Sequence, residues 1–187
     1  MITETFNIKG MICTRCLKVL NNELRNTGAE VINIQLGKVT IKYKPDKVEK
    51  KLISRIIQDN DFEIIEGEDV LLAERTKRWV INYVWNTDLE KNISEYLSTN
   101  LEKGYIQISR NFSKVFGQTI ERYCLLLKIE KAKEAIEVDG VSFKEVAHML
   151  GYQNSSALAK QFKKETGITM KQFRAQSEIG RIPVDKI

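Results

Sequence analysis

Two cysteines three residues apart, Cys13 and Cys16, are the side chains whose type and spacing most clearly indicate chemistry. They follow Gly10, where an alternating strand pattern gives way to a helical one, so both sulfur atoms can turn toward one point. The N-terminus of a helix favours the thiolate form and lowers the pKa of the thiols. Thiolates are preferred ligands of Cu(I), zinc and related soft ions, so the pair predicts a soft-metal site.

The number of available ligands limits which metals the site can hold. Zinc normally takes four protein ligands, whereas the third cysteine, Cys124, and the single histidine, His148, lie far downstream. A low-coordinate Cu(I) or Ag(I) site is therefore easier to build, and cadmium and mercury stay open. Two other uses of the cysteine pair are a reversible disulfide and a purely structural role. We expect Cys124 to be a small buried hydrophobe and His148 to be an exposed surface residue.

A helix-turn-helix pattern lies near the C-terminus. Apolar residues recur at helical spacing over 143–150, Gly151 stops that helix, and Asn154 or Ser155 can cap a second helix that ends at Gly167. The outward face of the second helix carries small and cationic side chains, which are Ser155, Ser156, Lys160, Lys163 and Lys164. Such groups suit a helix that enters the major groove of DNA and contacts its phosphates.

An upstream segment repeats this pattern at the same distance from a glycine. When Gly117 is aligned with Gly167, the matched pairs are Arg110 with Lys160, Phe112 with Phe162 and Lys114 with Lys164. Between the two copies, residues 120–137 contain no Gly or Pro and have apolar residues at helical spacing. The repeat therefore predicts two helix-turn-helix units that one rigid helix connects.

The first third of the chain alternates between strand and helix patterns. Strand patterns occupy 3–9, 31–34, 39–43 and 62–65, and helical patterns occupy 17–26 and 48–58. This β-α-β-β-α-β order is that of a ferredoxin-like fold. A further helical pattern over 71–85 contains Trp79, Tyr83 and Trp85, which we expect to pack on the DNA-binding half.

Charge is unevenly distributed along the 187 residues. Residues 1–69 hold 11 basic and 11 acidic side chains, and residues 70–187 hold 19 and 14, so the net charge of +5 belongs to the second part. A basic half beside a neutral half fits a nucleic-acid-binding module joined to another domain. No run approaches the ~18 apolar residues that cross a bilayer, and the first residues do not resemble a secretory signal. We therefore expect a soluble, cytoplasmic protein without a membrane partner.

The letters GMICTRC, which include both cysteines, match the GMxCxxC pattern of a known family. Residues 3–66 resemble the heavy-metal-associated domain of copper chaperones and P-type metal ATPases. The resemblance implies that Cys13 and Cys16 bind Cu(I) or a similar soft ion and that Met11 packs inward. The chain departs from the family at Asp61, where Gly is frequent.

The runs KIEKAKEAI and VAHMLGYQNSSALAKQFKKETGITMKQFR resemble the AraC/XylS-type DNA-binding domain, over about residues 89–175. In that family the second helix of each helix-turn-helix unit lies in the major groove. The resemblance implies that the DNA-binding residues are Tyr105, Gln107, Arg110, Lys114, Asn154, Ser155, Ser156, Ala157, Lys160 and Lys164. Arg110 is the best candidate to read guanine, and Gln107 can read adenine. Because one helix connects the units, we expect an asymmetric site in two successive major grooves of double-stranded DNA, ~34 Å apart.

These features predict an α+β protein, with a ferredoxin-like βαββαβ domain followed by an all-α double helix-turn-helix domain. The expected parts are a heavy-metal-associated domain at 1–68, a helical connector at 69–88, an AraC-type DNA-binding domain at 89–176 and a tail at 177–187. We expect a non-enzymatic transcriptional regulator that responds to a soft metal ion, Cu(I) first, with Zn, Ag, Cd or Hg as alternatives. One rival is a metal carrier or storage protein whose helical half binds partners, and another is a redox-sensing regulator. An alkylation-repair enzyme would need a tetrathiolate zinc site, which two cysteines cannot supply, and a homodimer that shares one ion stays open.

Overall fold

The computed structural model describes residues 1–86, 89, 92–138, 140–175, 180–184 and 187. The chain divides into two compact units, Met1–Arg75 and Thr76–Ile187. The boundary between them falls within helix α3 (Glu68–Asn86), so one continuous helix begins in the first unit and ends in the second.

The first unit is built on a four-stranded antiparallel sheet with the strand order β2-β3-β1-β4. The strands are β1 (Ile2–Lys9), β2 (Glu30–Gln35), β3 (Lys38–Tyr43) and β4 (Glu63–Ile64). Central strand β1 pairs with β3 from Ile2 opposite Tyr43 to Asn7 opposite Lys38, and with β4 at Ile8 opposite Ile64. This topology confirms the predicted ferredoxin-like βαββαβ domain.

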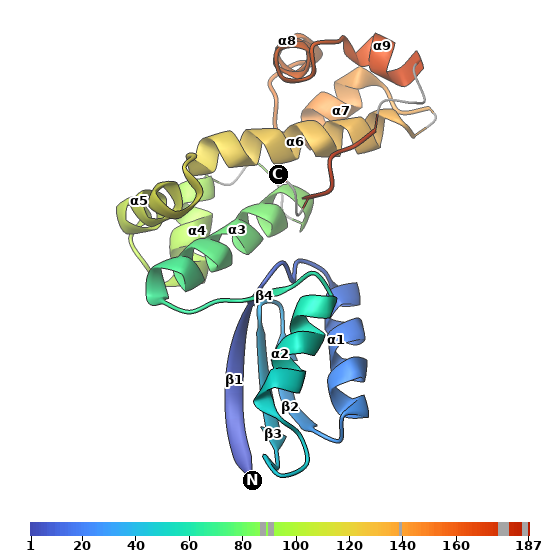
Figure 1. Ribbon diagram of the computed structural model, residues 1–187. Helices are drawn as coiled ribbons and strands as arrows, with labels where there is room; N and C mark the ends of the chain where they lie inside the picture. Colours follow the sequence, from blue (N-terminus) through green and yellow to red (C-terminus); the bar gives the residue numbers. More distant parts are fainter. Residues whose placement is uncertain (87–88, 90–91, 139, 176–179, 185–186) are drawn as a thin grey trace. The chain divides into compact units, whose positions relative to one another are not determined.

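Helices α1 (Thr14–Asn26) and α2 (Lys50–Asp59) cover one face of this sheet (Figure 1). Phe6 and Ile8 of β1 alternate toward that face, where they join Leu20 and Leu24 of α1 in one buried apolar cluster. Burying each of these side chains contributes about 1.5–3 kcal/mol before the entropy cost of folding. Helix α1 begins at Thr14, three residues earlier than the pattern over 17–26 predicts, so it includes the second cysteine.

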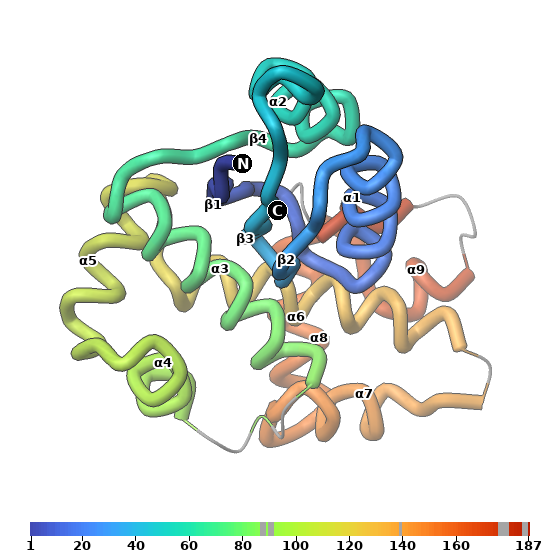
Figure 2. The backbone as a smooth tube through the Cα atoms, turned by 90° about the horizontal axis from the view of Figure 1, so that it is seen from below, coloured from blue at the N-terminus to red at the C-terminus, as the bar shows by residue number. Residues whose placement is uncertain are grey.

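The described part of the second unit is helical. After α3 come α4 (Ile93–Leu101), α5 (Tyr105–Phe116), α6 (Ile120–Ile136), α7 (Phe143–Met149), α8 (Ser155–Thr166) and α9 (Met170–Ala175). The pairs α4–α5 and α7–α8 are the two predicted helix-turn-helix units, with α6 as the connecting helix between them (Figure 2). No sequence pattern indicated α9. No described helix is long and apolar enough to cross a membrane.

Local capping explains where these helices begin and end. The side-chain oxygen of Asn92 accepts a hydrogen bond from the backbone of Ser94, and that of Asn154 accepts one from Ala157 at 2.8 Å. Gly117 and Gly167 end α5 and α8 with φ values of 68° and 79°, a conformation that favours glycine. The predicted cap of α8 at Asn154 and its predicted stop at Gly167 are therefore confirmed, and Asn92 and Gly117 play the same parts in the first unit.

Aromatic contacts join α3 to α4 of the first helix-turn-helix unit. The ring of Tyr96 in α4 lies 5.8 Å from that of Trp79 and 5.3 Å from that of Tyr83, measured between centroids. These contacts confirm that the aromatic face of α3 packs on the DNA-binding half. Cys124 is buried and His148 is exposed, as predicted.

Candidate metal and DNA-binding sites

The start of helix α1 brings the two cysteines of the first unit together. Cys13 is the extended N-cap residue, with φ −142° and ψ 164°, and Cys16 lies in the first turn of the helix. Their sulfur atoms are 3.3 Å apart, well beyond the ~2.05 Å of a disulfide, and both thiols are free. Cys13 is exposed and Cys16 is half-buried, so an ion from solvent can reach the pair.

The loop that carries Cys13 is held from both sides. Met11 is fully buried in the apolar cluster, which confirms the inward packing that the family resemblance implies. Gly10 has a φ of 92°, and a Cβ atom there would lie 3.4 Å from Cδ1 of Phe62 and 3.5 Å from the carbonyl oxygen of Asp61. Asp61 itself has a φ of 59°. Asp61 therefore adopts a left-handed conformation, which glycine, the residue frequent at this position in the family, adopts without steric cost.

The surroundings of Cys13 favour its thiolate. Burial alone raises the pKa of this thiol, but hydrogen bonds from the backbone and side chain of Cys16, from the backbone of Arg15, and the positive charge of Arg15 together lower it. The net result is a Cys13 pKa below the ordinary value. A lowered pKa favours the thiolate, which is the form of cysteine that metal binding and thiol oxidation both require.

The donor set near the cysteines fits a soft ion of low coordination number. Among the described residues, no group of three or more His, Cys, Asp or Glu side chains gathers in a way that could hold a metal. Cys124 belongs to the second unit, and burial raises the pKa of its thiol to about 11. Two thiolates suit Cu(I) or Ag(I), whereas a zinc site within one chain would lack two of its four ligands.

In the second unit, helix α5 presents most of its predicted DNA-binding residues to solvent. Gln107, Arg110 and Lys114 are exposed on its outward face. Tyr105 is half-buried, and its hydroxyl donates a hydrogen bond of 2.5 Å to Glu121 Oε1 in the first turn of α6. Burial and this bond raise the pKa of Tyr105. The Tyr105 phenol therefore has a partner within the protein, while the side chains of Gln107 and Arg110 extend into solvent.

Helix α8 has a similar outward face. The exposed predicted residues are Asn154, Ser156, Ala157, Lys160 and Lys164, and Ser155 is half-buried. The side-chain oxygen of Asn154 is occupied by its capping bond to Ala157, which leaves the Asn154 amide nitrogen to meet a base or phosphate. Lys163, next to Lys164, is exposed as well.

Two neighbouring residues in the first turn of α6 contact the second helix of each helix-turn-helix unit, α5 and α8. Glu121 binds Tyr105 of α5, and Nη1 of Arg122 lies 2.7 Å from Oε2 of Glu165 near the end of α8. The bond to Arg122 lowers the pKa of Glu165, whose side chain is almost fully buried. Sequence patterns missed these contacts because each one joins residues on different helices.

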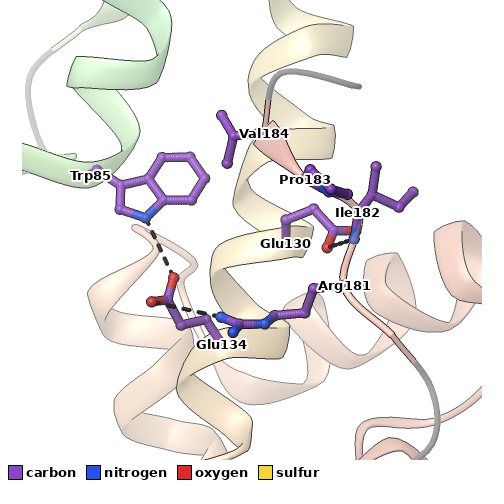
Figure 3. A pocket seen from close by; sticks show the side chains of 7 residues that line it. All are labelled: Trp85, Glu130, Glu134, Arg181, Ile182, Pro183 and Val184. Carbon is purple, nitrogen blue, oxygen red and sulfur yellow. Dashed lines mark hydrogen bonds and ion pairs between the residues drawn. The ribbon is translucent and has the colours of Figure 1, made fainter. Parts of the chain in front are cut away.

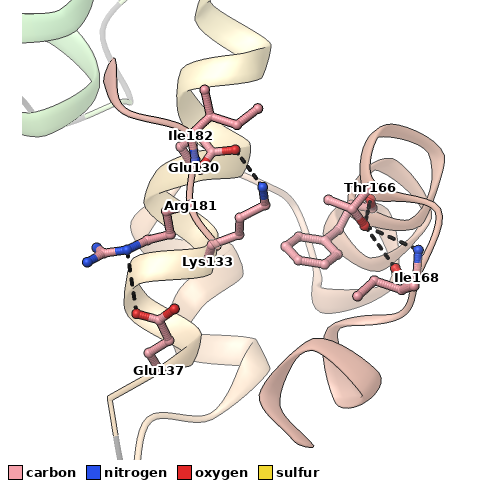
Figure 4. A network of polar contacts seen from close by, with 8 residues as sticks. Glu130, Lys133, Glu137, Thr166, Ile168, Arg181 and Ile182 are labelled. Atoms are coloured by element: carbon pink, nitrogen blue, oxygen red, sulfur yellow. Dashed lines mark hydrogen bonds and ion pairs between the residues drawn. The ribbon is translucent and has the colours of Figure 1, made fainter. Parts of the chain in front are cut away.

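The C-terminal residues pack along α6 through a network of charged groups (Figure 4). The backbone N–H of Ile182 donates to Oε2 of Glu130 at 2.8 Å, and Oε1 of Glu130 accepts from Lys133 at 2.6 Å. Arg181 lies 3.7 Å from Glu134 and 3.6 Å from Glu137. This segment therefore adds ion pairs to the surface of the connecting helix.

An open cavity of about 410 Å³ lies under this segment, lined by Trp85, Glu130, Glu134, Arg181, Ile182, Pro183 and Val184 (Figure 3). Its two carboxylates already have partners within the protein. Glu130 binds Lys133 and Ile182, while Glu134 lies near Arg181 and accepts from the Trp85 indole N–H at 3.4 Å. The cavity therefore leaves neither carboxylate in need of a ligand.

Comparisons with known proteins fit both halves of the chain. A family model described as a helix-turn-helix domain matches residues 97–176. The copper chaperone CopZ of Bacillus subtilis (strain 168) is 31% identical over 67 residues, which cover 34% of this chain and 97% of the chaperone. CopZ of Staphylococcus aureus (strain MRSA252) is 30% identical over 69 residues, which cover 35% of this chain and 100% of the chaperone.

Among solved structures, a transcriptional regulator with an AraC-type DNA-binding domain from Chromobacterium violaceum shares the fold. It aligns with a TM-score of 0.51 and 16% identity over 58% of this chain and 97% of that one. The fold and the comparisons thus define a helix-turn-helix protein with an appended chaperone-like domain.

The N-terminal third of the chain belongs to the CopZ-type heavy-metal-associated family. The C-terminal half contains a helix-turn-helix domain with the fold of an AraC-type DNA-binding domain. Neither match is to a family of enzymes, which confirms the prediction of a non-enzymatic protein.

Proposed function

We propose that this protein is a transcriptional regulator whose affinity for DNA changes when Cys13 and Cys16 bind a soft metal ion, Cu(I) first. The observation that carries the proposal is the reduced sulfur pair, 3.3 Å apart, in a CopZ-like domain on the same chain as two helix-turn-helix units. The two thiolates would hold the ion. Its binding would displace their protons and bridge the loop to helix α1.

Helix α3 supports coupling between metal and DNA. It begins directly after the CopZ-like domain and continues without interruption into the helical unit, with no flexible Gly/Ser linker between them. A change at the metal loop that favours one arrangement of the two units would alter the affinity for DNA. Couplings of this kind are typically ~1–3 kcal/mol, which is about 5- to 150-fold in affinity.

The DNA partner would be a duplex with an asymmetric site, because the exposed faces of α5 and α8 carry different side chains. Arg110 and Gln107 offer bidentate contacts to guanine and adenine in one major groove. Ser156, Lys160 and Lys164 offer shorter polar groups and phosphate contacts in the next one.

The test is selection of binding sites from a randomised duplex pool by the purified, reduced full-length chain, with and without Cu(I). A Cys13→Ser/Cys16→Ser variant removes the donors, and Cys124→Ser is the matched control because that thiol is buried in the second unit. We expect one asymmetric site whose affinity changes with Cu(I) in the wild type and in Cys124→Ser alone. Failure to select any site would refute the regulator and favour a metal carrier or storage protein.

A redox-sensing regulator is the second candidate, favoured by the short sulfur separation and the lowered pKa of Cys13. It requires an external oxidant, such as a disulfide reagent, that takes two electrons and two protons from the thiols as the Cys13–Cys16 bond forms. Treatment of the metal-free chain with diamide separates the two functions. A change in DNA affinity with diamide but not with Cu(I) would assign the cysteines to redox sensing.

A further inference from the structure

Helix α5 exposes a large apolar side chain at its DNA-facing end. Ile106, the second residue of the helix, is 69% exposed, and among the large hydrophobic residues that the structure describes only Met1 is more exposed, at 76%. The inward face of the same helix is well packed, since Ile108 and Phe112 are fully buried. Ile106 therefore faces away from the core of its own unit.

The neighbours of Ile106 on this face are the side chains best suited to reading bases. Gln107 is the next residue, and Arg110 lies one helical turn further, where residues four apart share a face. Tyr105, the other bulky side chain in this turn, is bound to Glu121. Ile106 is thus the apolar group that would enter the groove with the first turn of α5.

We propose that Ile106 recognises a thymine in the half-site bound by α5, through contact with the C5-methyl group of the base. This inference rests on the DNA-binding function proposed above. In the major groove only thymine among the four bases presents a methyl group, and apolar side chains contact it directly. The branched Cβ of isoleucine restricts its χ1 rotamers, so little side-chain freedom is lost on contact.

The same feature makes the two half-sites unequal. Alignment of Gly117 with Gly167 places Ser156 of α8 at the position of Ile106, and Ser156 is exposed but polar. At this position, therefore, only helix α5 offers an apolar side chain to the methyl group. The two recognition helices would read different sequences even where their phosphate contacts match.

The test replaces thymine with deoxyuridine, which removes the methyl group and keeps the base pair. Once a site has been selected with the full-length chain, each thymine in it is replaced singly, and affinity is measured for the wild type, Ile106→Ala and the control Val138→Ala. Val138 is 54% exposed and lies outside α5 and α8. We expect one thymine whose replacement weakens wild type and Val138→Ala about fourfold and leaves Ile106→Ala unchanged.

Equal losses in wild type and Ile106→Ala at every thymine, or a selected site without a sensitive thymine, would overturn the inference and leave DNA binding intact. Failure to select any site would instead overturn the proposed function on which it rests. Ser156→Ile supplies a gain-of-function test, because it should add one methyl-sensitive thymine in the other half-site. If a variant folds poorly, the deoxyuridine scan of the wild type still tests whether a thymine methyl group contributes to the affinity.

Discussion

At the scale of single residues, the hydrogen bonds around Cys13 determine how readily its thiol ionises. Burial opposes ionisation, but the backbone and side chain of Cys16 and the nearby Arg15 outweigh it. The folded pKa of Cys13 therefore lies below that of an unfolded cysteine, which is about 8.5–9. It follows that the thiolate contributes stability that is present above the unfolded pKa and is lost as pH falls through the folded pKa.

Alkylation of the native chain tests this ionisation. We expect iodoacetamide to modify Cys13 in the native chain with a midpoint pH below that of the urea-unfolded chain, since the thiolate is the reactive form. Cys124 should react only after unfolding in urea, because it is buried and its pKa is about 11. Mass spectrometry of the labelled peptides reports each site, and Arg15→Ala should raise the Cys13 midpoint. A native Cys13 midpoint at or above that of the unfolded chain would contradict the prediction.

Glu102 is held in a conformation that glycine adopts at lower cost. It ends helix α4 with a φ of 53° and ψ of 40°, in the turn of the first helix-turn-helix unit. We expect Glu102→Gly to raise the free energy of unfolding by about 0.5–1 kcal/mol, measured by urea denaturation. The reverse control is Gly117→Ala, at a φ of 68°, which should lower it by about 1 kcal/mol. Destabilisation by Glu102→Gly would show that its side chain has contacts that outweigh the strain.

At the scale of elements, the first turn of α6 is where both recognition helices are tied to the connecting helix. Glu121 holds the start of α5 through Tyr105, and Arg122 holds the end of α8 through Glu165. A double helix-turn-helix domain reads two grooves only if both recognition helices keep a fixed spacing. We therefore assign Glu121 and Arg122 a positioning role.

Charge reversal tests the pairing of Arg122 with Glu165. Arg122→Glu should weaken binding to a full two-groove site about tenfold through repulsion from Glu165. The swapped double variant Arg122→Glu/Glu165→Arg should recover most of that loss, measured by fluorescence anisotropy. Arg55→Glu, an exposed arginine in the first unit, is the matched control and should change nothing. A double variant as weak as the single one would exclude the pair as a positioning contact.

The cationic residues of the recognition helices differ in what they are expected to recognise. Lys160→Ala removes one phosphate contact, so it should weaken binding to all sequences and reduce the slope of log affinity against log salt by about 0.9. Arg110→Ala should cost about 1–3 kcal/mol at one base pair and relax the preference there. Affinities for the selected site and its single-base variants, measured at several salt concentrations, distinguish the two roles. A loss of affinity at only one base pair for Lys160→Ala would mean that Lys160 contacts a base and not a phosphate.

At the scale of the whole molecule, two units share one continuous helix, so no flexible linker separates the proposed metal site from the helical unit. Linkage requires that an ion which binds only the folded state also stabilises it. Stability thus offers a readout of metal binding that does not depend on DNA.

We expect Ag(I) or Cu(I) at about 100 times its dissociation constant to stabilise the first unit by about 2.7 kcal/mol. Chemical denaturation followed by circular dichroism measures the shift, and the Cys13→Ser/Cys16→Ser variant should lose it entirely. Zinc at the same concentration should stabilise the first unit less, because the described residues near the cysteines offer no third ligand and zinc should bind more weakly. An equal shift in the variant would mean that the metal binds elsewhere.

Much of this architecture follows from the sequence because the signals are local. The spacing of Cys13 and Cys16 indicates a soft donor pair, the caps at Asn92 and Asn154 and the stops at Gly117 and Gly167 mark helix ends, and hydrophobic periodicity indicates both domains. Each of these signals depends on residues within a few positions of one another, where backbone geometry alone limits the outcome.

Only the tertiary structure decided which side chains meet across the chain. It turned Tyr105 toward Glu121, paired Arg122 with Glu165, set Ile182 beside α6 and left Ile106 exposed on α5. Helical periodicity specifies the face on which a residue lies, but the partner of that face depends on how distant helices pack. For that reason the sequence by itself determined the donor pair and the two recognition helices, while their positioning contacts required the folded chain.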